Sequence, residues 1–300
     1  MAEAHERKIK RILAREWKQI RDGWLDCVPT ISRAGQAPAH QLSELTSLEG
    51  QLTKISDSQV EEVDEISGLR SGMLHDAIFL LHKASHVLGA CLVHVDKGMC
   101  TWSISSAYQS AFFAMKSIMA FLGVCVVESG NRHFLIDVWG TSHERKRRNK
   151  GPFIILANTR RNEQRNYWAY FQRSVEQTLD RDDIWNADVT GQLLNWDYKD
   201  FGRQRNKLHY HTNWWPLDDL HGCVNAPEFG KWRSLDCVDS DDDPDFPLLL
   251  AFALVRMAGD LLTDLAQESV LIERELSLLQ SRLSQPFAEL YQKSQLDQAS

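Results

Sequence analysis

The sequence predicts a mainly helical fold, a bundle that carries a small β-hairpin insertion and ends in a long amphipathic helix. Apolar residues recur at steps of three and four over most of the chain, which is the spacing of one face of an α-helix. The segment 103–122 is apolar almost all round, so a helix there must lie at the centre of a bundle. The helical pattern stops at Gly123 and resumes near residue 160, and β structure is expected in this interval.

Residues 1–66 are expected to form a helical extension ahead of the bundle. In residues 4–25, basic side chains alternate with isoleucine, leucine and tryptophan at helical spacing, which predicts a basic amphipathic helix. The stretch 28–41 contains two prolines and a glycine and is expected to be a loop. Leucine, isoleucine and valine at helical spacing predict a second, acidic helix over 41–66.

The bundle is expected to span residues 67–283. A stripe of apolar residues from Leu74 to Val95 predicts a long helix that ends at Gly98, and the central helix 103–122 follows it. Small residues on this central helix allow its neighbours to approach closely; they are Ala107, Ala111 and Ala114.

Three further segments complete the predicted bundle. Helices are expected over 160–179 and about 186–208. Residues 212–247 contain four prolines and an acidic run and are expected to be a loop. Residues 248–283 are expected to form one long amphipathic helix or a bent pair, and 284–300 a C-terminal tail.

Residues 124–158 are expected to be a basic, β-containing insertion in the bundle. The apolar runs VCVVE and RHFLIDVW lie on either side of Ser129-Gly130-Asn131, which predicts a β-hairpin with a short turn. The run FIILA at 153–157 predicts a third strand, and the basic segment HERKRRNK at 143–150 lies between them.

Composition limits the classes of function. The 34 lysines and arginines against 41 aspartates and glutamates leave a net charge of −7, so nucleic-acid binding would need a local basic patch. Six scattered cysteines without a C-x-x-C pair argue against a disulfide scaffold or a cysteine zinc site, and fit a reducing cytoplasm. The N-terminus lacks the apolar core of a signal peptide, and the longest apolar run, Phe246–Ala258, contains Arg256 and is short for a membrane span. We therefore expect a cytoplasmic protein with no membrane partner.

One segment carries residue types that suit a chemical reaction. In GRQRNKLHYH at 202–211, Arg205 is followed by Asn206, and His211 lies six positions after the arginine. This pattern resembles the R-x(4–6)-H motif of the HEPN superfamily, in which a polar residue follows the arginine. The segment AYQSAFFAMKSIMAFLG at 107–123 also resembles the helix at the centre of HEPN bundles. The resemblance covers roughly 70–122 and 185–270 and implies a HEPN-like helical bundle.

The resemblance implies a metal-independent endoribonuclease that cleaves single-stranded RNA, works as a homodimer and needs no cofactor. Histidine, with a pKa of about 6.5, can move protons near neutral pH, and arginine can stabilise the charge of a phosphorane. The implied catalytic residues are Arg205, Asn206 and His211. Arg203 and His209 have the same spacing, so they form an alternative register. Arg205 and His211 are preferred because Asn206 follows Arg205 as the family pattern asks, and Arg203 and His209 are then assigned supporting roles or phosphate contacts. The implied setting is a toxin or antiphage-defence effector, with a cognate antitoxin or regulatory protein as a further partner.

Two groups of residues are candidates for RNA contacts. A basic stretch could hold the RNA backbone, and its members are Arg145, Lys146, Arg147, Arg148 and Lys150, continuing to Arg160 and Arg161. It could equally be a solvated loop or a docking surface for an acidic segment such as the aspartate-rich run at 236–245. Trp214 and Trp215 directly follow the motif and could stack on bases, whereas the other tryptophans nearby are expected in the core.

Three alternatives to catalysis stay open. The motif could be a basic helix C-terminus, where Lys, Arg and His are favoured by the helix dipole. The chain could be a non-catalytic HEPN-type module that binds RNA, a nucleotide or a protein. It could also be a helical structural protein with no nucleic-acid role. The histidines at helical spacing, His75, His82, His86 and His94, have no carboxylate or cysteine partner at ligand spacing, so no metal site is expected.

Overall fold

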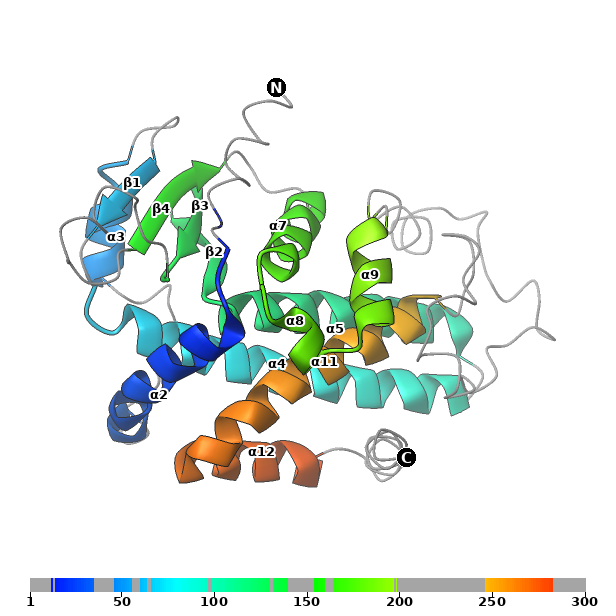
Figure 1. Cartoon of the computed structure of the whole chain (residues 1–300). Helices are drawn as coiled ribbons and strands as arrows, with labels where there is room; N and C mark the ends of the chain where they lie inside the picture. Colours follow the sequence, from blue (N-terminus) through cyan, green and yellow to red (C-terminus); the bar gives the residue numbers. More distant parts are fainter. Residues whose placement is uncertain are drawn as a thin grey trace. The chain divides into compact units, whose positions relative to one another are not determined.

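The fold is that of a computed structural model, in which helices predominate and a small antiparallel sheet is present, as predicted (Figure 1). The structure describes residues 12, 14–34, 46–55, 60–63, 66–96, 99–129, 132–139, 154–159, 164–196, 198 and 246–282.

The chain divides into two compact units. One consists of residues Met1–Phe79 and Lys116–Ile184 and is called the mixed unit, because it holds the sheet. The other consists of residues Leu80–Met115 and Trp185–Ser300, and its described elements are all helices, so it is called the helical unit. Two long helices contribute residues to both units: α4 (Leu69–Asp96) and α5 (Cys100–Phe121).

Helices α4 and α5 confirm the strongest sequence predictions. The first covers the predicted stripe from Leu74 to Val95, and the second covers nearly all of 103–122. The three alanines of α5 are fully buried, as their small size suggested. Gly98, the predicted end of the first helix, lies outside the described residues.

The sheet of the mixed unit has four antiparallel strands in the order β1-β4-β3-β2 (Figure 1). The predicted hairpin is confirmed, because β2 (Val124–Ser129) pairs with β3 (Arg132–Asp137) and Ser129 lies opposite Arg132. The predicted third strand is confirmed as β4 (Ile154–Thr159).

The helix predicted over 41–66 is wrong in its second half. The described part of this segment contains a short helix, α3 (Thr46–Leu52), and then a strand, β1 (Val60–Val63). Strand β1 pairs with β4, whose outer edge would otherwise present unpaired backbone groups. Apolar spacing cannot reveal a pairing partner so distant in sequence, and taken alone the local pattern indicates a helix.

The N-terminal helix begins later and ends later than predicted. Helix α2 spans Trp17–Ala34, so the predicted start at residue 4 is wrong for the described residues 14–16, and the loop predicted from residue 28 is helical up to Ala34. The Asp180 carboxylate accepts hydrogen bonds from the backbone N–H groups of Trp17 (2.6 Å) and Lys18 (3.2 Å). A carboxylate suits a helix N-terminus, which explains why α2 starts there.

The backbone of Arg15, just before α2, is hydrogen-bonded to the residues that follow α7. The Arg15 N–H donates to the Gln177 carbonyl, and the Leu179 N–H donates to the Arg15 carbonyl, both at 2.9 Å. These bonds follow directly after α7 (Gln164–Glu176), which confirms most of the helix predicted over 160–179. A four-residue helix, α8 (Arg181–Ile184), comes next.

In the helical unit, α9 spans Ala187–Asn195, so the helix predicted over 186–208 ends earlier than expected. Asn186 caps its start, accepting hydrogen bonds from the N–H groups of Asp188 and Val189. Trp196 follows in an extended conformation (φ −69°, ψ 132°), which ends the helix.

Helix α9 runs along α11 (Phe246–Glu268) in the opposite direction. At its start, the Trp185 indole N–H donates to the Met257 carbonyl at 3.1 Å. At its end, the rings of Trp196 and Phe246 lie 5.1 Å apart. The two contacts lie eleven residues apart on both segments, which corresponds to about 16 Å of helix. The equal separation is what two antiparallel helices in contact along their length require.

The C-terminal helix is a bent pair, one of the two predicted forms. Helix α11 ends at Glu268 and α12 spans Val270–Arg282, with Ser269 between them. The expectation of amphipathic character is wrong for the first part of α11, because each residue from Phe246 to Gly259 is buried. It holds for the last part of α11, where Leu261 and Leu265 are buried and Asp264 is partly exposed. It holds for α12, which buries Ile272 and Leu279 on one face.

Within the described residues, two helices have the length and apolar composition of a membrane span. They are Leu69–His94 and Phe246–Glu268. The apolar segment in α11 is thus longer than the run Phe246–Ala258 that the sequence analysis identified. Of its most apolar window, however, 89% is buried inside the fold, which is the behaviour of a core helix.

We expect Gly123→Ala to lower the free energy of unfolding by about 3 kcal/mol. Gly123 has φ +79°, and a Cβ there would lie 2.0 Å from the Trp139 ring. The matched control is Gly191→Ala in α9, where a Cβ meets nothing within 4 Å and helix propensity predicts a gain of about 1 kcal/mol. Urea denaturation of the three proteins measures both effects, and equal stability of the two variants would contradict the predicted close contact.

Candidate functional site

The residues predicted to carry the chemistry lie outside the described part of the chain. This holds for Arg205, Asn206 and His211, and for the supporting residues Arg203 and His209. It also holds for the expected RNA contacts Arg145, Lys146, Arg147, Arg148, Lys150, Arg160, Arg161, Trp214 and Trp215.

The segment that carries the motif starts and ends at one place in the helical unit. It follows Tyr198, just after α9, and the described chain resumes at Phe246, the first residue of α11. The rings of Trp196 and Phe246 are in contact across this gap, with their planes tilted by 57°. Trp185, at the other end of α9, is buried against α11, which confirms the core role expected for this tryptophan.

Helix α5, the other carrier of the HEPN resemblance, is packed closely against α4. In the helical unit, the Ser110 hydroxyl donates to the Ala84 carbonyl at 2.8 Å, and Tyr108 is only 3% exposed. In the mixed unit, the Ser117 hydroxyl donates to the Ala77 carbonyl at 2.7 Å. Each of these two serine hydroxyls has its hydrogen-bond acceptor on the neighbouring helix, so α4 and α5 can lie close together without leaving the two buried hydroxyls unpaired.

A buried charged pair on α11 was missed by the sequence analysis. The Arg256 Nε donates to the Asp260 Oδ1 at 2.8 Å, one helical turn away, and the two side chains are 8% and 22% exposed. Burial raises the pKa of Asp260 to about 6, against the opposing effect of the Arg256 charge. A carboxyl group that titrates near neutral pH can exchange protons there. The i, i+4 spacing of the two residues within an apolar run was the available signal.

Three histidines of α4 lie close to a polar side chain. In the helical unit, the His82 Nε2 lies 3.6 Å from the Glu275 Oε2 on α12, and the His94 Nδ1 lies 3.3 Å from the Ser106 Oγ. In the mixed unit, the His75 Nδ1 lies 3.8 Å from the Asp76 Oδ1. Among the described residues, no three His, Cys, Asp or Glu side chains come together in a group that could hold a metal ion.

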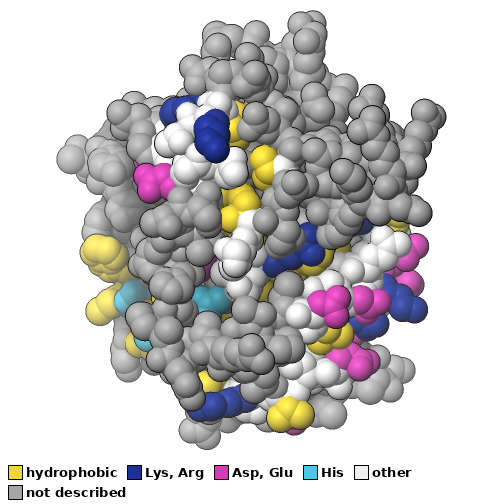
Figure 2. Space-filling model, turned by 90° about the vertical axis from the view of Figure 1, so that its left-hand side faces the viewer, with side chains coloured by type: hydrophobic (Ala, Val, Ile, Leu, Met, Phe, Trp, Pro, Cys, Tyr) yellow, Lys and Arg dark blue, Asp and Glu magenta, His cyan; other side chains and the backbone are white. Residues whose placement is uncertain are grey.

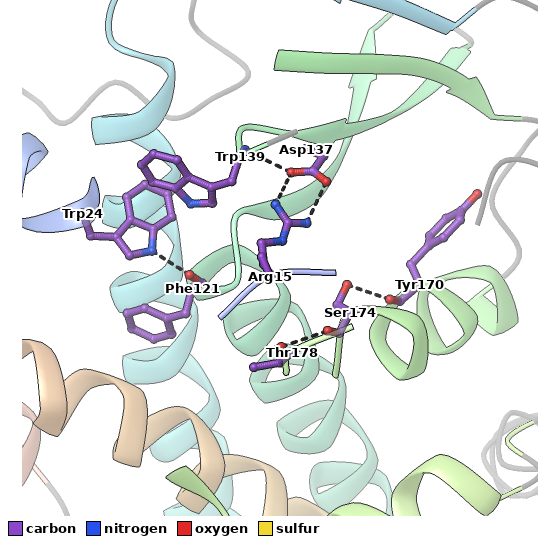
Figure 3. A network of polar contacts seen from close by, with 8 residues as sticks. All are labelled: Arg15, Trp24, Phe121, Asp137, Trp139, Tyr170, Ser174 and Thr178. Atoms are coloured by element: carbon purple, nitrogen blue, oxygen red, sulfur yellow. Dashed lines mark hydrogen bonds and ion pairs between the residues drawn. The ribbon is translucent and has the colours of Figure 1, made fainter. Parts of the chain in front are cut away.

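The mixed unit contains a buried polar network that fixes the N-terminal segment to the sheet (Figure 3). The Arg15 guanidinium donates to both carboxylate oxygens of Asp137, at 2.6 and 2.7 Å, and Asp137 also accepts from the Trp139 N–H at 3.0 Å. Arg15 is 9% exposed and Asp137 2%. The bidentate pair of Arg15 with Asp137 therefore connects the chain ahead of α2 to the end of β3.

The aromatic rings beside this network are also packed rather than free to bind. The Trp24 and Trp139 rings meet edge to face at 4.9 Å, and the Trp24 indole N–H donates to the Phe121 carbonyl at 2.6 Å (Figure 3). The Arg70 guanidinium lies 4.1 Å from the centre of the Trp139 ring. Such contacts fix the two indoles in place.

The basic stretch of the sequence is attached to the sheet at two separate points. Residues 143–150 connect the end of β3 to the start of β4 at Ile154, whereas Arg160 and Arg161 follow the end of β4 at Thr159. A strand of this length measures about 17 Å between these ends. On the described part of the face in Figure 2, cationic and acidic side chains are interspersed and form no single cationic field.

Comparison with known proteins gives no match: no family model, no curated protein and no solved structure matches the chain.

We expect the Asp260 carboxyl to make the stability of the protein fall between about pH 4 and pH 6. The folded state binds this proton more tightly than the unfolded chain, so the stabilisation is complete below the unfolded pKa and is lost as the pH rises through the folded pKa. A rise in pKa from 3.8 to about 6 corresponds to about 3 kcal/mol. Asp260→Asn mimics the neutral acid. The difference in unfolding free energy between parent and variant, measured by urea denaturation from pH 4 to 7, should therefore change by this amount. A pH-independent difference would contradict the assignment.

We expect Arg15→Met to lower the free energy of unfolding by about 3–5 kcal/mol, because it leaves the Asp137 carboxylate buried without its cation. The double variant Arg15→Met, Asp137→Asn should be more stable than Arg15→Met alone, since no charge then stays buried. The matched control is Arg173→Met. It removes an equally short pair with Glu176 (2.6 Å), whose side chains are 25% and 54% exposed, and should cost about 1 kcal/mol or less. Equal losses at Arg15 and Arg173 in denaturation experiments would contradict the role of burial.

Proposed function

We propose that this chain is a HEPN-like, metal-independent endoribonuclease that cleaves single-stranded RNA and acts as a toxin or antiphage-defence effector in the cytoplasm. The observation that carries the proposal is helix α5. Its AYQSAFFAMKSIMAFL sequence resembles the central HEPN helix. Of the residues in that pattern, Ala107, Tyr108 and Ala114 are buried as a central helix requires, whereas Phe112 is partly exposed.

The arrangement of the helical unit supports the same proposal. The Arg205-to-His211 motif lies in the segment between α9 and α11, and the aromatic contact of Trp196 with Phe246 brings the two ends of that segment together. Arg205 is seven residues beyond Tyr198, so the covalent chain keeps the start of the motif within about 25 Å of Tyr198.

The proposed reaction uses the substrate's own 2′-hydroxyl. His211 accepts the proton of this hydroxyl as its oxygen attacks phosphorus, and the bond from phosphorus to the 5′-oxygen breaks. The products are a 2′,3′-cyclic phosphate and a 5′-hydroxyl, which takes up the released proton. Arg205 stabilises the charge of the pentavalent phosphorus, and Asn206 orients the histidine or binds a phosphate oxygen. As the family resemblance implies, two copies of the motif come together in a homodimer, and an antitoxin or regulatory protein restrains them.

We expect the purified protein to cleave single-stranded RNA in the presence of EDTA and to leave 2′,3′-cyclic phosphate ends. His211→Ala should lower the cleavage rate by roughly 10²–10⁴-fold, because it removes a general acid and base. The matched control is His86→Ala, which removes an exposed imidazole from α4 and should keep full activity. Induced expression of the parent protein, but not of His211→Ala, should arrest growth.

Each other outcome selects a different reading. An RNA mobility shift that weakens with salt, with the strand left intact, would contradict catalysis and favour the non-catalytic HEPN-type binding module. A protein that neither binds nor cleaves RNA would contradict both. Equal activity of the parent and a variant lacking both Arg205 and His211 would show that the motif is not the active site.

A further inference from the structure

Two rows of side chains lie on the same side of the α4–α5 helix pair within the helical unit. On α5, Trp102, Ser106, Gln109 and Phe113 recur at steps of four, three and four, which places them on one stripe. The Lys83 ammonium of α4 lies 4.2 Å from the centre of the Phe113 ring, and the His94 ring of α4 contacts Ser106. Lys83 and His94 are eleven residues apart and also share one stripe, so the two rows face the same way. We call these six residues the α4–α5 face.

The α4–α5 face is open to solvent. Trp102 is 57% exposed, which is unusual for so large an apolar side chain, and Lys83 and Gln109 are also exposed. Phe113, Ser106 and His94 are partly exposed. No residue of the two stripes is acidic, although the whole chain carries a net charge of −7. The face therefore departs from the average electrostatics of the protein in the direction that favours a polyanion.

The spacing of the aromatic residues distinguishes the partner. Trp102 and Phe113 are eleven residues apart, or about 16 Å along the helix, and polar side chains lie between them. A lipid surface or an apolar protein partner would fit a continuous apolar patch. Two separate exposed rings, one of which lies beside the ammonium group of Lys83, instead fit a single-stranded nucleic acid. Each nucleotide offers a flat base that can stack on a ring and a phosphate that can bind a cation.

We propose that the α4–α5 face binds single-stranded RNA by stacking bases on Trp102 and Phe113, while Lys83 contacts the backbone. This proposal rests on the proposed ribonuclease function and assigns it a substrate-binding surface on described residues, separate in sequence from the catalytic motif. Because the surface positions RNA rather than reacting with it, its loss should raise KM and leave kcat unchanged.

The test uses the full-length protein and a fluorescein-labelled 2′-O-methyl oligouridylate. This probe has no free 2′-hydroxyl, so the proposed reaction cannot cleave it. Trp102→Ala should raise the Kd from fluorescence anisotropy by about tenfold, the usual contribution of one stacked base. Trp102→Phe keeps a ring and should restore most of the affinity. Lys83→Gln should lower the salt dependence of log Kd by about one phosphate contact.

Two matched controls separate stacking from general apolar contact. Met99→Ala removes an exposed apolar side chain three residues from Trp102, and Val270→Ala removes one from the start of α12. Both should leave the Kd unchanged. A Kd unaltered by Trp102→Ala, or lowered affinity in Trp102→Ala that Trp102→Phe does not restore, would overturn the proposal.

The remaining outcomes are distinguishable from failure of the proposed function. Intact cleavage with an unchanged KM in Trp102→Ala would overturn the binding face while leaving the nuclease in place. Absence of oligouridylate binding by the parent protein would overturn this proposal, whatever the cleavage assay shows. If Trp102→Ala instead abolishes binding to phosphatidylcholine vesicles, or changes the oligomeric state in light scattering, the face serves lipid or protein and the RNA assignment is wrong.

Discussion

The close contact between α4 and α5 is the constraint on which the rest of the structure depends. Helix α5 has so little polar surface that it can be stable only when other elements surround it. The hydroxyls of Ser110 and Ser117 donate to carbonyls of α4, so these two buried groups are satisfied at the contact. The α4–α5 face also depends on this pairing, because it combines the exposed stripe of α5 with Lys83 and His94 of α4.

The two buried charge pairs show how exposure decides the role of an ion pair. Arg15 and Asp137 are both almost inaccessible and satisfy each other in a bidentate geometry, so the pair connects an N-terminal segment to the sheet. Arg256 is equally buried, and burial raises the pKa of its partner Asp260, whose side chain still reaches partly to solvent (22% exposed). The Asp260 carboxyl can therefore respond to pH, whereas the geometry of Arg15 and Asp137 indicates a structural role.

The two proposals assign different tasks to different parts of the chain. Chemistry is assigned to a histidine and an arginine in the segment between α9 and α11, and substrate holding to rings on α5. Such a division is physically reasonable, because proton transfer needs groups placed within hydrogen-bond reach of the reacting atoms, whereas stacking needs only flat exposed rings. The net negative charge of the whole chain makes a localised binding surface necessary for any polyanionic substrate.

The sequence by itself determined the elements whose signals are local. Helices α4 and α5 follow from apolar periodicity, and the β2–β3 hairpin from two apolar runs around Ser129-Gly130-Asn131. The motif residues Arg205 and His211 come from sequence resemblance alone and lie outside the described residues.

Only the tertiary structure decided the features that depend on distant partners. Strand β1 exists because β4 offers a free edge, and α2 starts at Trp17 because the Asp180 carboxylate accepts its first N–H groups. Arg15 meets Asp137 across 122 positions of sequence. The raised pKa of Asp260 depends on burial, and the shared direction of Lys83 and Phe113 depends on how two helices pack. Periodicity describes one segment at a time, and none of these properties belongs to one segment.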